Sequence, residues 1–179
     1  MKKILNNLLI GIAFTLIASS CKKENLSTIN PFTDIANFGK GAYITLNSTV
    51  NLNLNYAAIS TSKVSVKVDA YNNGVTIKEV KLFVVQSSNA DPKTWKLIKT
   101  VPVSGTTELS VTGAEIATAI GKTPAALFAP GQFYTIYNQV VTSDNKTYDV
   151  SNTLQALEAS SNYNTCFRWT AYVVCPFTG

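Results

Sequence analysis

The sequence of 179 residues contains no histidine, and only 14% of its residues are charged. Without histidine there is no Ser-His-Asp or Cys-His nucleophile system, no histidine acid or base, and no histidine-ligated metal. The low charge and the 46% of hydrophobic residues exclude intrinsic disorder, which needs the opposite balance. We therefore expect one ordinary globular domain that is not an enzyme and that holds no cofactor and no metal.

The chain has a single arginine, Arg168, although its net charge is +5. Four lysines lie within the first 23 residues. From Asn25 onward, ten lysines and the arginine face nine acidic residues, which leaves a net charge of +2. Proteins recognise phosphates and bases mainly through bidentate contacts of arginine side chains. The sequence also has no run of basic residues with interleaved aromatic residues. We expect no binding of nucleic acid.

The N-terminus has the pattern of an export signal. Met1-Lys2-Lys3 is basic, and Ile4 to Ala18 is apolar apart from two asparagines and one threonine. The apolar part is shorter than the roughly 20 residues that a membrane-spanning helix needs, and it fits the hydrophobic region of a signal peptide. Ala18-Ser19-Ser20 are small residues that lead into Cys21. We expect residues 1–20 to be a signal peptide.

Cys21, placed directly after small residues, resembles the cysteine of a bacterial lipoprotein box, whose thiol is acylated and becomes the mature N-terminus. Ala18 stands where the usual box has leucine. Several acyl chains, such as palmitate, give stable anchoring, whereas one chain binds membranes reversibly. We expect residues 21–37 to be the acylated cysteine and a polar tether, and residues 38–179 to be the folded domain. In the alternative interpretation, Cys21 is merely a small residue near a secretory cleavage site.

From Ala42 on, apolar and polar residues alternate with the period of a half-buried strand. The first run predicts one strand face made of Val50, Leu52, Leu54 and Tyr56. Strand-like runs follow at residues 64–68, 77–85, 95–103, 108–111, 133–142, 147–150 and 167–174. In the run at 133–142, one side is expected to hold Phe133, Thr135, Tyr137, Gln139 and Val141.

One segment departs from this alternation. Thr112-Gly113-Ala114-Glu115 has the form of a capping box, and Gly121 is suited to end a helix, so we expect a helix of about two turns from Gly113 to Ile120. Seven to nine short strands with at most one helix are typical of a β-sandwich of immunoglobulin or fibronectin III type. The expected fold class is therefore all-β, with a closed barrel as the alternative.

Several segments together resemble surface lipoproteins of the Bacteroidota to which no activity is assigned. They are the lipoprotein box, Asn37–Tyr43, Thr112–Gly121, Gly131–Tyr134 and Cys175–Phe177. Genes of such proteins often sit beside those of SusC/SusD-type outer-membrane nutrient transporters, where SusE-like lipoproteins also occur. In such proteins a further β-rich domain commonly follows the Cys-Pro-Phe segment, so a chain that stops at Gly179 would be truncated before it.

The resemblance implies a lipid-anchored protein of the outer membrane, exposed at the cell surface. It would be a non-catalytic accessory or binding module of a nutrient uptake system, with the transporter complex or a polysaccharide as partner. The alternative is a structural spacer or docking module of a larger surface lipoprotein, without ligand binding of its own.

Cys166 and Cys175 are the other two cysteines. The oxidising periplasm favours a disulfide between them. Against it, nine residues along one straight strand span about 30 Å, whereas a bridge needs Cα atoms within about 7 Å. Both a 166–175 disulfide and free, buried thiols stay open at this point.

Trp95 and Trp169 are the candidate ligand-binding residues, because sugar rings stack on flat aromatic faces. Trp95, beside Lys93 and Lys96 at the start of a strand, is expected to be the better exposed of the two. The alternative is that both tryptophans are buried or half-buried strand residues.

Two carboxylate pairs are candidates for glycoside hydrolysis, Asp69 with Asp149 and Asp144 with Glu79. Their separation would decide that chemistry, and no catalytic motif surrounds them, so we expect solvated strand faces. The segment 144–149 lacks the spacing of a calcium loop and predicts a turn.

Overall fold

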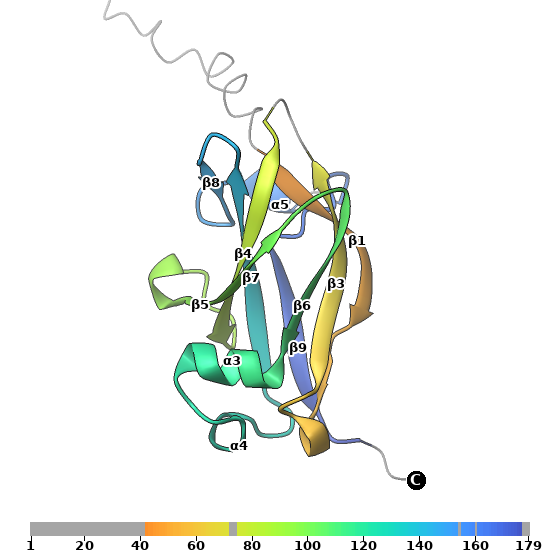
Figure 1. The fold of residues 1–179 in the computed structure, drawn as a ribbon, viewed down its shortest axis with the longest axis vertical. Coiled ribbons are helices and arrows are strands. Elements are labelled where there is room, and N and C mark those ends of the chain that lie inside the picture. The colour runs from red at the N-terminus through yellow and green to blue at the C-terminus, as the bar shows by residue number, and fades with distance from the viewer. Residues whose placement is uncertain (1–41, 72–74, 154, 160, 177–179) are drawn as a thin grey trace, which may run out of the picture. The chain divides into compact units, whose positions relative to one another are not determined.

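Strands in two sheets make up most of the structure, a computed structural model that describes residues 42–71, 75–153, 155–159 and 161–176. The smaller sheet has the order β1 (Tyr43–Asn51), β3 (Lys63–Tyr71), β6 (Thr106–Thr112). The larger sheet has the order β2 (Asn53–Asn55), β9 (Arg168–Val174), β7 (Phe133–Thr142), β4 (Ile77–Gln86), β5 (Lys96–Pro102), and β8 (Thr147–Tyr148) pairs with β7 (Figure 1). The all-β prediction is confirmed. The expected signal peptide of residues 1–20 and the expected lipid attachment at Cys21 lie outside the described residues.

The inward faces of the two sheets enclose one hydrophobic core. Alternate residues of β3 and β4 are fully buried in it, as the period-two pattern predicts. These residues are Val64, Val66, Val68, Val80, Leu82 and Val84. Residues of β6, β7 and β9 also belong to the core: Leu109, Val111, Tyr134, Ile136, Val140, Trp169, Ala171 and Val173. The described strands lie in two sheets, so they do not form the closed barrel that was the alternative.

The chain changes sheets after β1. It leaves β3 at Asn51 and joins the larger sheet at Asn53, where β2 pairs parallel to β9 while the other strand pairs are antiparallel. The prediction of one buried face from Val50 to Tyr56 is therefore wrong. Leu54 is fully buried, but Val50 is 53% exposed. The crossover between sheets ends the alternation that one continuous strand would keep.

The helix α3 (Gly113–Ile120) is confirmed with its predicted caps. Glu115 N donates to the Thr112 hydroxyl at 3.2 Å, and Thr112 N donates to the Glu115 carboxylate at 2.7 Å. Gly121 adopts a φ of 80°, which ends the helix in a left-handed turn. Ile116 and Ala117 are fully buried in the core.

The first turn of α3 lies against the loop that follows the short helix η2 (Tyr56–Ala58). Gly113 N donates to Ser62 O at 3.0 Å, and Ala114 N donates to Ser60 O at 3.2 Å. A Cβ at position 113 would overlap the carbonyl oxygen of Ile59, so this close approach needs glycine.

Four further helical turns among the described residues were not predicted: η2, η3 (Pro92–Thr94), α4 (Pro124–Leu127) and α5 (Gln155–Ala159). Segments of three to five residues are too short for a helical hydrophobic period to be recognised.

We expect Gly113→Ala to lower the free energy of unfolding by about 1–3 kcal/mol or more, because the added methyl group overpacks the contact between α3 and the 59–62 loop. Thr118→Ala, at an exposed position of the same helix, is the control and should change stability little. Urea unfolding monitored by circular dichroism measures both. Equal stability of the two variants would contradict the close approach.

Candidate functional site

Trp95 is buried, with only 7% of its surface exposed. Its ring stacks on Tyr137 with centroids 4.2 Å apart and planes at 9°, and its Nε1 donates to Asn89 O at 3.0 Å. Phe83 packs on the same ring at 5.8 Å. The predicted exposure of Trp95 is therefore wrong. Tyr137 belongs to the face of the larger sheet that points away from the core, called the outer face below, and the loop between β4 and β5 folds over part of it.

The first residue of that loop, Ser87, is hydrogen-bonded to β7. Ser87 has a left-handed backbone with a φ of 64°, which costs a non-glycine residue some strain. Its N donates to Phe133 O at 3.1 Å, and its carbonyl accepts from the Thr135 hydroxyl at 2.6 Å. These bonds turn the chain at the end of β4 and direct the loop across the outer face.

Trp169 points to the other side of the sheet, into the core. It too is 7% exposed, and its Nε1 donates to the Asn138 side-chain oxygen at 3.3 Å. The Asn138 side-chain nitrogen donates to Cys166 O at 2.6 Å. This satisfied buried network links β7 to the segment before β9. For both tryptophans the buried alternative is correct, and neither presents an exposed ring face.

Cys166 and Cys175 are free thiols, the first buried and the second exposed. The straight strand β9 runs between them, which is the geometry that argued against a bridge. The 166–175 disulfide is therefore wrong, and the free-thiol alternative holds. Burial raises the pKa of the Cys166 thiol to about 12, so it stays protonated at neutral pH.

Asp69 and Asp149, the first of the two carboxylate pairs, have separate structural partners. Hydrogen bonds from Thr106 and Asn47 hold the pKa of Asp69 below its usual value. Asp149 is buried, so the expectation of a solvated strand face is wrong for this residue, and its carboxylate accepts bonds from Gln139 and Ser151. A general acid of a glycosidase needs a raised pKa, so the pKa of Asp69 is shifted in the wrong direction.

The predicted turn at 144–146 is present. Asn145 has a φ of 61°, and Lys146 forms an ion pair of 3.1 Å with Asp144. Bonds from Thr142 and Lys146 lower the pKa of Asp144. Within the described ranges, no three Cys, Asp or Glu side chains come together as a metal site would require.

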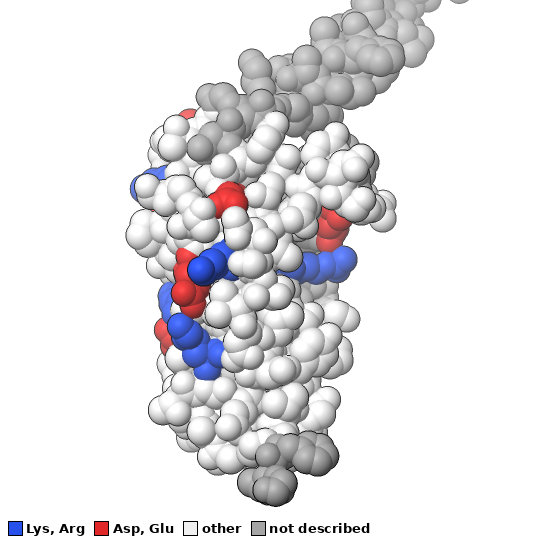
Figure 2. Space-filling model, turned by 90° about the vertical axis from the view of Figure 1, so that its right-hand side faces the viewer, with Lys and Arg blue, Asp and Glu red and all other residues white. Residues whose placement is uncertain are grey.

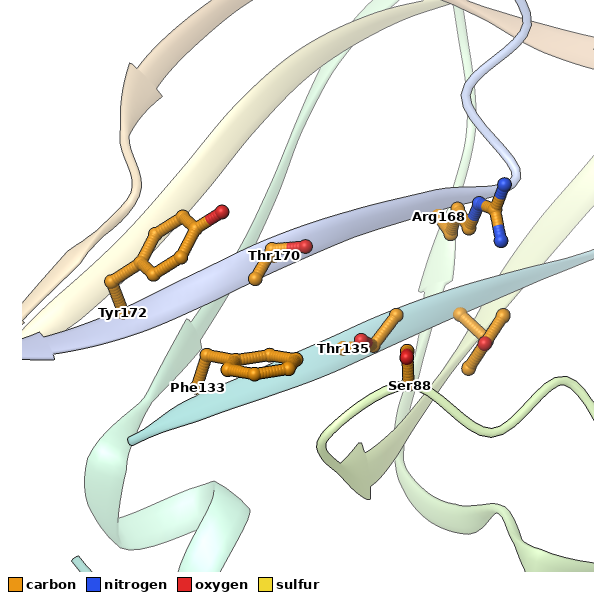
Figure 3. A pocket seen from close by; sticks show the side chains of 7 residues that line it. Ser88, Phe133, Thr135, Arg168, Thr170 and Tyr172 are labelled. Carbon is orange, nitrogen blue, oxygen red and sulfur yellow. The ribbon is translucent and has the colours of Figure 1, made fainter. Parts of the chain in front are cut away.

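A groove lies on the outer face along β7 and β9. The two strands pair so that Phe133 faces Tyr172, Thr135 faces Thr170, and Tyr137 faces Arg168. These six residues and Ser88 line a cavity of about 210 Å³. Figure 3 shows the aromatic pair at one end, Arg168 and Ser88 at the other, and the two threonines between them. We call this cavity the β7–β9 groove.

The aromatic end of the β7–β9 groove is open to solvent. Phe133 is 37% exposed and Tyr172 is 48% exposed, and their ring centroids lie 6.4 Å apart at an angle of 42°. Four residues along a strand separate this pair from the Tyr137–Arg168 pair, a span of about 13 Å. The groove thus joins an apolar platform to a polar end.

The polar end holds hydrogen-bond donors. Tyr137 is fully buried, and its hydroxyl has no hydrogen-bond partner among the described residues. Arg168 Nη2 lies 2.9 Å from Glu158 Oε1, so the single positive charge of the lining is compensated. None of the described residues that line the groove is acidic.

Sequence reasoning missed the β7–β9 groove although it predicted the face shared by Phe133, Thr135 and Tyr137. The signal was a pattern that occurs twice. In the runs 133–137 and 168–172, alternate positions hold first an aromatic residue or arginine, then a threonine, then an aromatic residue. Recognising a site required the pairing of those two runs in this register, which the sequence does not state.

Charges do not gather into a field of one sign on the face drawn in Figure 2, where blue and red side chains are few and lie near one another. The four ion pairs found among the described residues are Lys63–Glu108, Lys99–Glu115, Lys146–Asp144 and Arg168–Glu158.

No protein-family model and no curated protein matches the sequence. Within the described ranges, none of the helices has the length and apolar character needed to span a bilayer.

We expect a thiol-reactive maleimide at pH 8 to label Cys175 in the folded protein and Cys166 only after unfolding, because the Cys166 thiol is buried and protonated. Peptide mapping by mass spectrometry distinguishes the two sites. A peptide pair joined by a 166–175 disulfide, or equal labelling of both cysteines in the folded state, would contradict the structure.

We expect Trp95→Ala to destabilise the fold by about 3–5 kcal/mol, because it removes a buried ring stacked on Tyr137. Trp95→Phe keeps an aromatic ring and should cost clearly less. Denaturant unfolding of the two variants gives the comparison, and unchanged stability of Trp95→Ala would show that the ring is not packed as described.

Proposed function

We propose that the chain is a lipid-anchored lipoprotein of the outer membrane, held by an acylated Cys21 and exposed at the cell surface. In this proposal it serves as a non-catalytic accessory or binding module of a nutrient uptake system, with a glycan as ligand. The basic residues at 1–3, the apolar run at 4–18 and the small residues before Cys21 support the anchor.

We also infer that the two sheets form a β-sandwich of the immunoglobulin type. The order β1-β3-β6 corresponds to strands A, B and E, and β9-β7-β4-β5 corresponds to G, F, C and C′. Tyr134, near the start of β7, donates its hydroxyl proton to Leu127 O at 3.0 Å. A tyrosine corner places such a bond at the start of strand F. Strand order and this bond support the assignment.

The observation that carries the binding function is the β7–β9 groove. It combines two exposed aromatic rings, Phe133 and Tyr172, with hydroxyl groups and one guanidinium, and its described lining includes no carboxylate. Rings and hydrogen-bond donors hold a polar ligand, whereas glycoside hydrolysis needs two carboxylates at the scissile bond. This composition supports binding without catalysis.

A second hollow favours the alternative, a docking module. It lies between β5 and α3, has a volume of about 490 Å³ and is lined by Leu97, Ile98, Ala114, Glu115, Thr118 and Ala119. Leu97 is an exposed apolar residue, and exposed apolar surface marks sites of protein contact when it is contiguous.

The anchor is tested by fractionation. We expect wild-type protein, produced in a bacterium that acylates lipoproteins, to be recovered in the membrane fraction and to incorporate labelled palmitate, whereas Cys21→Ala should do neither. Cys175→Ala is the matched control and should behave as wild type. Palmitate incorporation by Cys21→Ala would refute attachment at this residue.

The partner is tested by purifying C-terminally tagged protein from native outer membranes in mild detergent. Co-purification of a transporter together with its surface lipoprotein would support the uptake accessory. Recovery of the protein alone would favour a free-standing module, and recovery from the soluble fraction would exclude the lipoprotein.

A further inference from the structure

We propose that the β7–β9 groove binds a short stretch of an uncharged glycan chain, with one sugar ring on the Phe133–Tyr172 platform and a neighbouring sugar at the Tyr137–Arg168 end. This inference rests on the proposed binding function and adds to it the site, the orientation and the chemical class of the ligand.

The platform is suited to the apolar face of a sugar ring. Phe133 and Tyr172 face each other across two hydrogen-bonded strands, and both keep more than a third of their surface exposed. Exposed aromatic rings on neighbouring strands offer large, rigid contact area at little conformational cost. Because both residues stand on strands inside the sheet, their backbone positions are fixed before a ligand arrives.

Because the hydroxyl of Tyr137 is buried and has no partner among the described residues, it favours a ligand that offers an oxygen acceptor. A buried hydroxyl without a partner costs about 1–3 kcal/mol, and such groups in a native structure call for an explanation. Tyr137 lines the groove, and the stacked ring of Trp95 holds its side chain in place. The hydroxyl has no accessible surface in this structure, so a sugar oxygen at this end of the groove would accept its proton, and remove this cost, only after a small shift of the side chains around it.

Arg168 adds donors to the same end without adding a net charge. A guanidinium has five N–H donors, and the ion pair with Glu158 engages Nη2. The remaining lining residues are uncharged: Ser88, Phe133, Thr135, Tyr137, Thr170 and Tyr172. A compensated charge gives little attraction for a carboxylate or a sulfate, so this balance favours a neutral sugar over an acidic one.

The volume and length of the β7–β9 groove favour a segment of a glycan chain over a small ligand that is fully enclosed. The cavity of about 210 Å³ is smaller than the roughly 300–1,000 Å³ of pockets that enclose drug-sized ligands. The two ends lie about 13 Å apart along the strands, which is longer than one sugar ring. The site is also on a sheet face, with β2 and β4 on either side of β9 and β7. An extended peptide that adds a strand needs an exposed edge.

Binding is measured by affinity electrophoresis and calorimetry with the full-length, detergent-solubilised protein. The neutral probes are amylopectin, mixed-linkage β-glucan, galactomannan, xylan and levan, and the anionic probes are polygalacturonate and chondroitin sulfate. We expect retention by at least one neutral polymer, and little change of its affinity between 50 mM and 500 mM salt, because screening weakens only charge-dependent binding.

Two variants test the site itself. Tyr137→Phe removes only the unpartnered hydroxyl, so we expect stability equal to or above that of wild type and affinity lower by about three- to tenfold. Tyr172→Ala removes half of the platform and should weaken binding by a similar factor. Tyr71→Ala is the matched control, a tyrosine that is 47% exposed on β3 in the other sheet, and its affinity should equal that of wild type.

The outcomes separate the site from the function. Wild-type binding that both groove variants leave unchanged overturns this site and leaves the proposed function standing. Retention by no polymer overturns the glycan function and the site together. Retention by the anionic probes alone, lost at 500 mM salt, or capture of an extended peptide in place of any glycan, overturns the ligand class.

Discussion

From Tyr134 to Asn138 the strand β7 is buried on both faces, and the rest of the larger sheet depends on this constraint. Its inward residues Tyr134 and Ile136 belong to the core, and its outward residues Thr135 and Tyr137 lie beneath the loop that carries Trp95. A strand covered on both sides cannot slip by one residue without moving every side chain to the wrong face. Its partners β4 and β9 are therefore held in register, and with them the residues that they display outward.

The β7–β9 groove begins where that cover ends. Toward Trp95 the outer face is closed by ring stacking, and toward Phe133 and Tyr172 it is open. One loop therefore fixes Tyr137 in place and leaves the aromatic platform free. Because Phe133 and Tyr172 stand on paired strands, their backbone positions are fixed in advance, which would reduce the conformational cost of binding a ligand on the platform.

Much of the fold could be predicted because its signals are local. The helix at 113–120 follows from the capping box of Thr112 with Glu115 and from Gly121, all within ten residues of one another. Trp95 could not be placed in this way. Its burial comes from Tyr137, which is 42 positions away in the chain but directly beneath it in the fold. The groove was missed for the same reason, since two runs of alternating residues become one surface only when β9 pairs with β7.

The crossing of the chain from β1 to β2 has a consequence for self-association. Exposed strand edges are templates on which further chains of the same kind can add and aggregate. On one side, β2 covers β9 with only three residues, and β1, at the edge of the smaller sheet, is interrupted by two register shifts. Short and irregular edges offer poor templates. Addition of a further strand on this side of the domain is therefore disfavoured, which leaves the aromatic platform beside β2 uncovered.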